Sequence, residues 1–494
     1  MVRLSSEQEY ALQAFQENHN LFITGPGGTG KTLLIQHLVR DAKNRGKKYQ
    51  VCALTGCASL LLNCNARTIH SWSGIKQCKG ENEKIISNVL FNKKTLKVWK
   101  NMEILIVDEV SMMSKKIFEI LDMIGRRARN QYYKPFGGLQ VVFVGDFYQL
   151  PPVGNYGDAD TQSFCFESPR WKEVFSLENH IILTTMFRQV DPIYQSILSN
   201  IRKGKLEESQ KKILQSYVNR KYDAEKHNGC IPTKLFPIKS RVENYNQTMF
   251  DQLPGESYDY NCIIKTNCKT YLDNTNRLLS ADNIHRGTLL TKPMQEKEIE
   301  LLQQNTPCIP LLSLKKGAAV MCTVNLDLDN GICNGSLGIV VDFIMKMGIP
   351  TPCVKFSNGI QREMPIQYWQ SEEYPTIAIG QFPLCLAWAM TIHKIQGATL
   401  PMAEMDIGRN IFEYGQTYVA LSRVKTLDGL YLSAFDPQGI RVNEKVVAFY
   451  STIPEVEYEM EEGENELDSE PFSFSAFEYK EEEPIDPTIK KIKL

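Results

Sequence analysis

The sequence predicts an α/β protein with two lobes, each a parallel β-sheet with helices on both faces, and with a β-rich insertion in the second lobe. Over the first 190 residues, short apolar runs alternate with helical patterns, and each run ends in a polar or glycine turn. Buried parallel strands joined by helices have this pattern. A second α/β pattern extends from about Asp191 to Tyr450. Between roughly Asn276 and Ala378 it changes to short strands with Gly and Asn turns, which indicates a small β-barrel insertion.

Individual strands can be assigned from these apolar runs. The strands expected in the first lobe are Leu21–Thr24, Val51–Leu54, Ile104–Val107 and Val141–Val144. Those expected in the insertion are Gly317–Thr323, Gly338–Phe343 and Thr351–Phe356. After Pro454 the charge is high and the aliphatic content too low to pack, so we expect residues 455–494 to form a disordered tail.

Composition narrows the class of protein. A chain of 494 residues, 43% of them hydrophobic, can bury more than one core, and its length suggests about three domains. No stretch approaches the roughly 18 apolar residues of a membrane span, and the first residues lack the apolar core of a secretory signal. We expect a soluble intracellular protein with no membrane partner and no mitochondrial presequence; nucleus and cytoplasm both stay open.

The thirteen cysteines are scattered, odd in number and without a C-x-x-C pair. This distribution favours free thiols in a reducing compartment, and we expect no metal held by cysteine.

The net charge of −1 hides an asymmetry. From Glu455 onward there are 14 acidic and 4 basic residues, a balance of −10, whereas the preceding 454 residues hold 43 acidic and 52 basic residues, a balance of +9. A basic body suits a polyanionic partner.

A phosphate-binding loop follows the first expected strand and precedes the helix-forming segment LLIQHLVRDA. Its residues are Gly25, Pro26, Gly27, Gly28, Thr29, Gly30, Lys31 and Thr32. Glycines let the backbone wrap so that its N–H groups and the helix N-terminus face phosphate oxygens. Lys31 would neutralise the β and γ phosphates and the Thr32 hydroxyl would hold Mg²⁺. The motif predicts a site for ATP and Mg²⁺.

Two carboxylates and a glutamine complete a hydrolytic site. Asp108 and Glu109 follow a buried apolar strand; we assign Asp108 to Mg²⁺ and Glu109 to the attacking water. Gln149 follows the next strand and can donate to a γ-phosphate while it accepts from a water, which suits a sensor. Together these residues predict hydrolysis in addition to nucleotide binding.

Three further residues have two interpretations each. Gln8 lies three residues after Ser5, so it either completes a helix capping box or contacts the adenine ring, and both can hold. Arg188 and Arg423 are candidate arginine fingers, planar cations delivered to the phosphoryl group when the lobes close. The ordinary alternative for a lone arginine is a surface ion pair.

Nine segments stand in the order found in one known family. They are GPGGTGKT, ALTGCASLLL, ARTIHSWSGI, ILIVDEVSMM, PFGGLQVVFVGDFYQLPPV, ILTTMFRQ, LKKGAAVMCTVNLDLDNGICNGSLGIV, QFPLCLAWAMTIHKIQGATL and GQTYVALSRVKTLDGLYL. In these segments, from about Leu4 to Asp436, the chain resembles the petite-integration-frequency (PIF) DNA helicases, superfamily 1 motors of subclass B related to RecD.

The resemblance implies a domain organisation. It implies RecA-like P-loop NTPase lobes over residues 1–190 and over residues 191–275 with 378–454, and an SH3-like β insertion over residues 276–377. It also implies a small wedge subdomain over residues 72–99 of the first lobe, for which a solvated helical hairpin is the alternative. Residues 455–494 form the acidic tail.

The resemblance also implies where DNA is bound. The residues it places along the strand-binding groove are Thr55, Gly56, Thr68, His70, Thr391, His393 and Lys394, in the main phosphate-contacting types. It further implies that Gln396 and Gly397 link DNA contact to the nucleotide cleft and that Asn334 and Gly335 belong to the inserted domain.

The implied function is that of an ATP-dependent 5′-to-3′ DNA helicase in replication, repair or recombination, acting as a monomer on single-stranded and on forked or tailed duplex DNA. Two alternatives stay open: an ATP-dependent translocase that displaces proteins without unwinding, and a non-enzymatic, nucleotide-gated DNA-binding subunit. The tail either binds a protein partner, competes with DNA for the basic groove, or only solubilises the chain.

Overall fold

The computed structural model describes residues 4–454 apart from residues 56–57, 60–61, 63, 65, 77, 79, 155–156, 223–231, 273–275, 328–329 and 372. Gly56 and the expected acidic tail therefore lie outside the described residues. None of the helices in the described ranges is both long and apolar enough to cross a membrane.

The first lobe is built on a parallel sheet with the strand order β3-β2-β4-β5-β1-β6. Its strands are β1 (Leu21–Thr24), β2 (Tyr49–Ala53), β3 (Arg67–Thr68), β4 (Ile104–Asp108), β5 (Gln140–Val144) and β6 (His180–Ile182). The four strands expected here are confirmed: β1 has the expected bounds, and the ends of the other three shift by at most two residues. Because every strand points the same way, the turns that carry the sequence motifs meet at one edge of the sheet.

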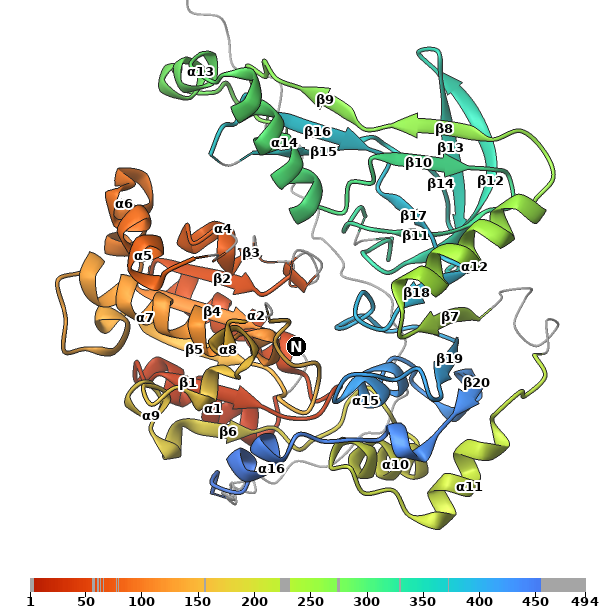
Figure 1. Ribbon diagram of the computed structural model, residues 1–494, viewed down its shortest axis with the longest axis horizontal. Helices are drawn as coiled ribbons and strands as arrows, with labels where there is room; N and C mark the ends of the chain where they lie inside the picture. The colour runs from red at the N-terminus through yellow and green to blue at the C-terminus, as the bar shows by residue number, and fades with distance from the viewer. Residues whose placement is uncertain are drawn as a thin grey trace, which may run out of the picture. The chain divides into compact units, whose positions relative to one another are not determined.

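Helices cover this sheet (Figure 1). They are α1 (Ser6–Gln16), α2 (Lys31–Asn44), α4 (Ile69–Ser73), α5 (Asn82–Phe91), α6 (Lys93–Asn101), α7 (Lys115–Ala128), α8 (Ala159–Gln162) and α9 (Trp171–Val174). Short 3₁₀ helices are η1 (Val110–Met112), η2 (Pro135–Gly138), η3 (Cys165–Glu167) and η4 (Leu177–Asn179). The segment expected to be a wedge is the helical pair α5 and α6. Trp99 of α6 is fully buried, and its indole N–H donates to the carbonyl oxygen of Ser73 at 3.2 Å. One face of the pair is therefore packed, not solvated.

The second lobe holds a smaller parallel sheet with the order β18-β7-β19-β20. Its strands are β7 (Thr233–Phe236), β18 (Ala389–Thr391), β19 (Ala403–Ile407) and β20 (Leu430–Phe435). The helices of this part of the chain are α10 (Pro192–Arg202), α11 (Glu208–Ser216), α12 (Lys239–Gln252), α15 (Gln416–Leu421) and α16 (Glu444–Tyr450), with the 3₁₀ helices η5 (Leu427–Gly429) and η6 (Pro437–Gly439). Two parallel sheets with flanking helices confirm the α/β class.

Antiparallel strands interrupt the second lobe. They form one sheet of order β14-β13-β12-β11-β17 and two smaller groups of order β10-β8 and β15-β16-β9. The strands are β8 (Tyr258–Asn261), β9 (Ile263–Lys265), β10 (Leu311–Leu314), β11 (Ala319–Cys322), β12 (Leu337–Lys346), β13 (Ile349–Phe356), β14 (Gln361–Glu363), β15 (Gln367–Gln370), β16 (Ala378–Gln381) and β17 (Leu384–Leu386). The three strands expected from the turn pattern are present as β11, β12 and β13. The pattern did not indicate the helices α13 (Ala281–Thr288) and α14 (Lys292–Asn305). Strands from both flanks of residues 276–377 join these sheets, and the domain boundaries stay a prediction.

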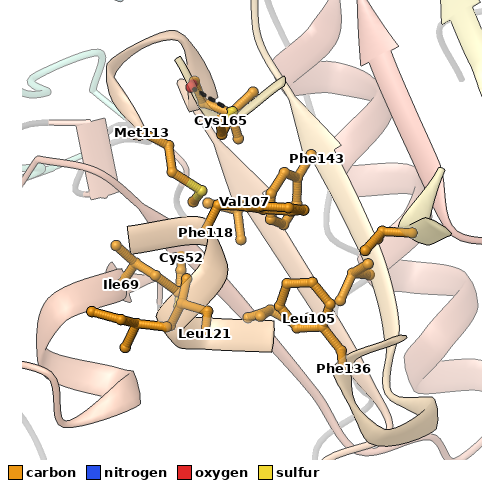
Figure 2. Close-up of a cluster of buried hydrophobic side chains, with 14 of the residues drawn as sticks. Cys52, Ile69, Leu105, Val107, Met113, Phe118, Leu121, Phe136, Phe143 and Cys165 are labelled. Carbon is orange, nitrogen blue, oxygen red and sulfur yellow. Dashed lines mark hydrogen bonds between the residues drawn. The ribbon is translucent and has the colours of Figure 1, made fainter. Parts of the chain in front are cut away.

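The first lobe has an aromatic core that also receives the end of the described chain. Phe118 and Phe143 are fully buried beside β4, and Figure 2 shows them with Val107 and Met113. Val446 of α16 belongs to this same core, with Phe449 packed against it. After β20 the chain therefore returns from the second sheet to the first.

Candidate active site

The phosphate loop joins β1 to α2. Gly28 and Gly30 adopt positive φ angles of 102° and 76°, and α2 begins at Lys31. The Lys31 ammonium donates to the carbonyl oxygens of Gly25 and Pro26 at 2.7 and 2.8 Å. Desolvation lowers the pKa of Lys31, and the negative charges of three nearby carboxylates, Asp146, Glu109 and Asp108, oppose that shift. Lys31 is thus a desolvated cation whose charge is partly compensated by carboxylates.

The two expected catalytic carboxylates lie at the end of β4. Asp108 is its last residue, and Glu109 follows with a left-handed backbone, φ 54°. The backbone N–H of Glu109 donates to Asp108 Oδ1 at 2.8 Å. Burial, and then the charge of Glu109, raise the pKa of Asp108 to about 7. The negative charge of Asp108 has little compensation from neighbouring groups. A bound divalent cation would supply that compensation and favour the ionised form of the carboxylate.

A glutamine from the second lobe reaches both Glu109 and Gln149. The Gln396 side-chain N–H donates to Glu109 Oε2 at 3.2 Å and to Gln149 Oε1 at 3.4 Å. Gln149 and Gln396 are both buried. The expected water-orienting residue and the expected sensor therefore share one hydrogen-bond donor.

Side chains of the second lobe, and Arg188 at the end of the first, lie against the phosphate loop itself. The backbone N–H of Gly27 donates to the Tyr418 hydroxyl of α15 at 2.8 Å. A Cβ at Gly27 would lie 3.7 Å from Arg423 Nη2, and a Cβ at Gly28 would lie 2.7 Å from Arg188 Cβ. The structure thus places both candidate arginine fingers at the loop that carries Lys31.

The two arginines are poorly compensated cations. Arg423 is 1% exposed and donates to the carbonyl oxygens of Val419 and Ala398, at 2.7 and 3.1 Å. Burial, and then the charge of Arg188, lower the pKa of Arg423 to about 9. Burial also lowers the pKa of Arg188, whose guanidinium donates to the Ser422 carbonyl oxygen at 3.2 Å. Two adjacent desolvated cations favour an anion between them, as the transferring phosphoryl group would be.

Gln8 combines two contacts. Its Oε1 accepts from the Ser5 backbone N–H at 3.1 Å, which confirms the capping interpretation. Its side-chain N–H donates to the Thr29 carbonyl oxygen at 3.1 Å. Gln8 thus links α1 to the phosphate loop by a hydrogen bond. Its contact with adenine stays a prediction.

An ion pair next to the site was not predicted from the sequence. Arg202 at the end of α10 donates to both carboxylate oxygens of Asp146, at 2.9 and 2.8 Å, and both residues are buried. Burial alone would lower the pKa of Arg202, but the pair with Asp146 outweighs it and raises that pKa. The guanidinium also lies over the rings of Tyr148 and Tyr450, 4.5 and 5.3 Å from their centroids. Asp146 lies inside a quoted segment, whereas no motif marked Arg202.

Tyr450 of α16 extends this cluster to the phosphate loop. Its hydroxyl lies 2.6 Å from the Thr24 hydroxyl at the end of β1 and accepts from the Phe147 N–H at 3.1 Å. The segment that returns from the second sheet thus ends directly beneath the nucleotide site.

The residues expected to contact DNA end strands in both lobes. Thr55 follows β2, Thr68 ends β3 and caps α4 through the Ser71 N–H at 3.3 Å, and Thr391 ends β18. The Thr391 hydroxyl accepts from the Lys394 N–H at 3.2 Å. Strand ends of this kind lie at the edge of a parallel sheet where ligands bind.

The other described residues of the expected DNA groove are His70, His393 and Lys394. Burial lowers the pKa of His70 and of His393, which favours their neutral forms, and His393 stacks on the Phe412 ring. Asn334 and Gly335 line a small cavity with Lys394 and Gln396, so the connection between β11 and β12 reaches the segment that carries the expected DNA contacts. The phosphate contacts of all these residues stay a prediction.

Two family models match the chain. Residues 3–214 match the model described as PIF1-like helicase, and residues 299–343 match the model described as DNA helicase Pif1, 2B domain. The chain is 33% identical over 452 residues to the ATP-dependent DNA helicase PIF1 of Xenopus laevis, across 91% of this chain and 64% of that relative. It thus spans somewhat less than two thirds of that relative's length.

Two solved structures are similar in both fold and sequence. The Pif1 helicase from Candida albicans matches with a TM-score of 0.69 and 30% identity, over 91% of this chain and 99% of that chain. The Pif1 helicase from Bacteroides, solved with ADP-AlF3 and single-stranded DNA, matches with a TM-score of 0.63 and 27% identity, over 91% and 97% of the two chains.

The raised pKa of Asp108 predicts a pH-dependent stability. Since the folded-state pKa lies above the unfolded one, the carboxyl group stabilises the fold at low pH, and this stability is lost as the pH rises through about 7. Asp108→Asn should therefore be more stable than wild type by about 1–4 kcal/mol near pH 8, and the difference should shrink towards about pH 5. Thermal unfolding at both pH values measures this, with the exposed Asp259→Asn as control. A difference independent of pH would contradict the assignment.

The buried pair predicts a large loss of stability when one partner is removed. Arg202→Met leaves the buried Asp146 carboxylate without its ion-pair partner, which should lower the free energy of unfolding by about 3–5 kcal/mol. Urea denaturation followed by circular dichroism measures it. The exposed Arg40→Met on α2 should change stability by about 0.5 kcal/mol or less. Equal effects of the two substitutions would show that the pair does not support the fold.

Proposed function

The chain belongs to the PIF1-like helicase family, and on this premise we propose that it is an ATP-dependent DNA helicase that moves 5′ to 3′ on single-stranded DNA and unwinds duplexes. The Xenopus laevis relative, which is named ATP-dependent DNA helicase PIF1, matches across 91% of this chain. The Bacteroides relative was solved with both a nucleotide analogue and single-stranded DNA, which supports the same two ligands here.

The observation that carries the proposal is the position of Gln396. It lies two residues after Lys394, in the segment proposed to grip the strand, and its amide bonds to both Glu109 and Gln149. A shift of Lys394 on binding DNA would move the donor shared by the water-orienting carboxylate and the γ-phosphate sensor. Strand binding and hydrolysis are thereby coupled.

The donor set fits ATP with Mg²⁺. Thr32 offers a hydroxyl in the first turn of α2 and Asp108 a buried carboxylate, the hard oxygen ligands that Mg²⁺ prefers. When bound, Mg²⁺ would neutralise charge on the β and γ phosphates. Glu109 would orient the attacking water, while Lys31, Arg188 and Arg423 stabilise the charge of the transferring group.

Movement along DNA follows from a nucleotide site to which both lobes contribute residues. ATP draws the lobes together because Arg423 and Tyr418 of the second lobe meet the phosphate loop of the first. Hydrolysis weakens this attraction, and the alternating grip on phosphates advances the motor along the strand. Thr55, Thr68, His70, Thr391, His393 and Lys394 supply that grip in our proposal, with Gly56 outside the described residues.

The pair α5 and α6 would serve as the wedge that separates the strands. Phe91, at the end of α5, is 84% exposed, and after Asn92 the helix α6 begins with Lys93 and Lys94. An exposed ring beside two lysines can stack on a base while the ammonium groups contact phosphates.

We propose that the motor acts as a monomer and that residues 455–494, with a charge balance of −10 and several aromatic residues, bind a basic protein partner. Because the chain belongs to this family, we also propose that the motor acts in replication, repair or recombination.

Hydrolysis and unwinding assays test the proposed function together. ATP hydrolysis should rise strongly when single-stranded DNA is added, and unwinding should occur with a 5′ tail but not with a 3′ tail alone. Lys31→Ala should abolish both activities because the phosphates lose their central cation. Strand-stimulated hydrolysis without unwinding would favour a translocase, and unwinding only from a 3′ tail would refute the polarity. No hydrolysis at all would refute the enzyme.

A further inference from the structure

A basic pocket lies on the first lobe away from the nucleotide site. It has a volume of about 690 Å³ and lies between the start of β2 and one face of α6. Lys94 and Lys97 line it from α6, and Lys47, Lys48 and Tyr49 line it from the start of β2. The helix positions are three residues apart and so share a face.

The geometry of the sheet keeps this pocket open. In the described part of the chain, β3 pairs only with Cys52 and Ala53 of β2, so the first residues of β2 have no strand on that side. Lys48 and Lys97 are exposed. The opposite face of α6 is anchored, because Trp99 is buried in the core. Lys94 and Lys97 therefore project from a helix that is fixed to the core on its other side.

The charge in the pocket is positive. Glu103 compensates one lysine: its carboxylate lies 3.0 Å from Lys47 Nζ and accepts from the Lys48 backbone N–H at 2.9 Å. Burial, and then the positive charges of Arg286 and Arg67, lower the pKa of Lys94, against the opposing charges of Glu373 and Asp282. Positive charge therefore surrounds Lys94 from two sides.

Aromatic side chains accompany these lysines. Tyr49 lines the pocket, and the exposed Phe91 lies at the turn from which α6 begins. A positive groove with interleaved aromatic rings is typical of single-strand nucleic-acid sites, where lysines follow the backbone and rings stack on bases. A site for a small anion would need no aromatic ring.

We propose that this pocket binds the displaced DNA strand, as a second single-strand site separate from the groove of Thr55, Thr68 and Thr391. This inference rests on the proposed function. If the strands part at the α5–α6 turn, the strand that does not enter the groove leaves along α6, where Lys94 and Lys97 face Lys48. Holding that strand opposes its reannealing behind the wedge.

Binding measurements on three DNA substrates test the proposal. Fluorescence anisotropy compares plain single-stranded DNA, a duplex with a 5′ tail, and a fork with an added 3′ tail that represents the displaced strand. The 3′ tail should increase wild-type affinity by about three- to tenfold at low salt. Lys48→Ala combined with Lys97→Ala should remove this gain and lower the salt slope for the fork by about 1.4, at about 0.7 for each lost single-strand phosphate contact.

Controls separate this inference from the proposed function. The double variant should retain wild-type affinity for plain single-stranded DNA and wild-type strand-stimulated hydrolysis, because both lysines lie outside the nucleotide site and the groove. The exposed pair Lys172→Ala and Lys203→Ala should retain the full gain from the 3′ tail. A wild type that hydrolyses no ATP with single-stranded DNA would instead refute the proposed function itself.

Three results would overturn the inference while the helicase proposal stands: no gain from the 3′ tail in the wild type, a gain that persists in the double variant, or an equal loss for the 5′-tailed duplex. The last result would assign the pocket to the duplex arm.

Discussion

The site depends on the close approach of second-lobe side chains to the phosphate loop. The backbone N–H of Gly27 donates to the Tyr418 hydroxyl at 2.8 Å, and Ser422 and Arg423 lie within van der Waals distance of the space beside the Gly27 Cα. At Gly28, a Cβ would lie 2.7 Å from the Cβ of Arg188, and the φ of 102° also disfavours any other residue. The loop that holds phosphate in the first lobe is therefore also the surface on which the second lobe closes, so neither lobe alone presents the full set of charges.

Buried charges near the loop fall into two groups. Asp146 and Arg202 form a bidentate pair that, with Tyr450 and Tyr148, supports the strand ends beneath the nucleotide. In contrast, no salt bridge among the described residues engages Asp108 or Arg423, and the pKa of each is shifted towards its neutral form. Each member of the paired group compensates the buried charge of the other, so the fold tolerates both only together. The unpaired group becomes favourable when a metal ion and a triphosphate supply the missing charges, which ties closure of the cleft to nucleotide binding.

The sequence predicted those parts of the fold and site that local patterns specify. The phosphate loop, Asp108 with Glu109, and Gln149 each follow a buried strand, so their meeting at one sheet edge follows from parallel topology. Contacts between segments far apart in the sequence have no local pattern that predicts them. Arg202, the partner of Asp146, ends a helix outside every motif, and Tyr450 contacts Thr24 across most of the length of the chain. Helix α14 was missed because its polar sequence has few apolar residues and gives little helical periodicity.

The central claim, that an arginine from the second lobe completes the chemistry of the first, is tested most directly with Arg423→Lys. This variant keeps the positive charge but loses the planar guanidinium. Single-turnover ATP hydrolysis with saturating single-stranded DNA should fall by about a thousandfold, while the affinity for a fluorescent ATP analogue changes little. Hydrolysis within about tenfold of wild type would show that Arg423 serves only to pack the second lobe, and it would contradict the account.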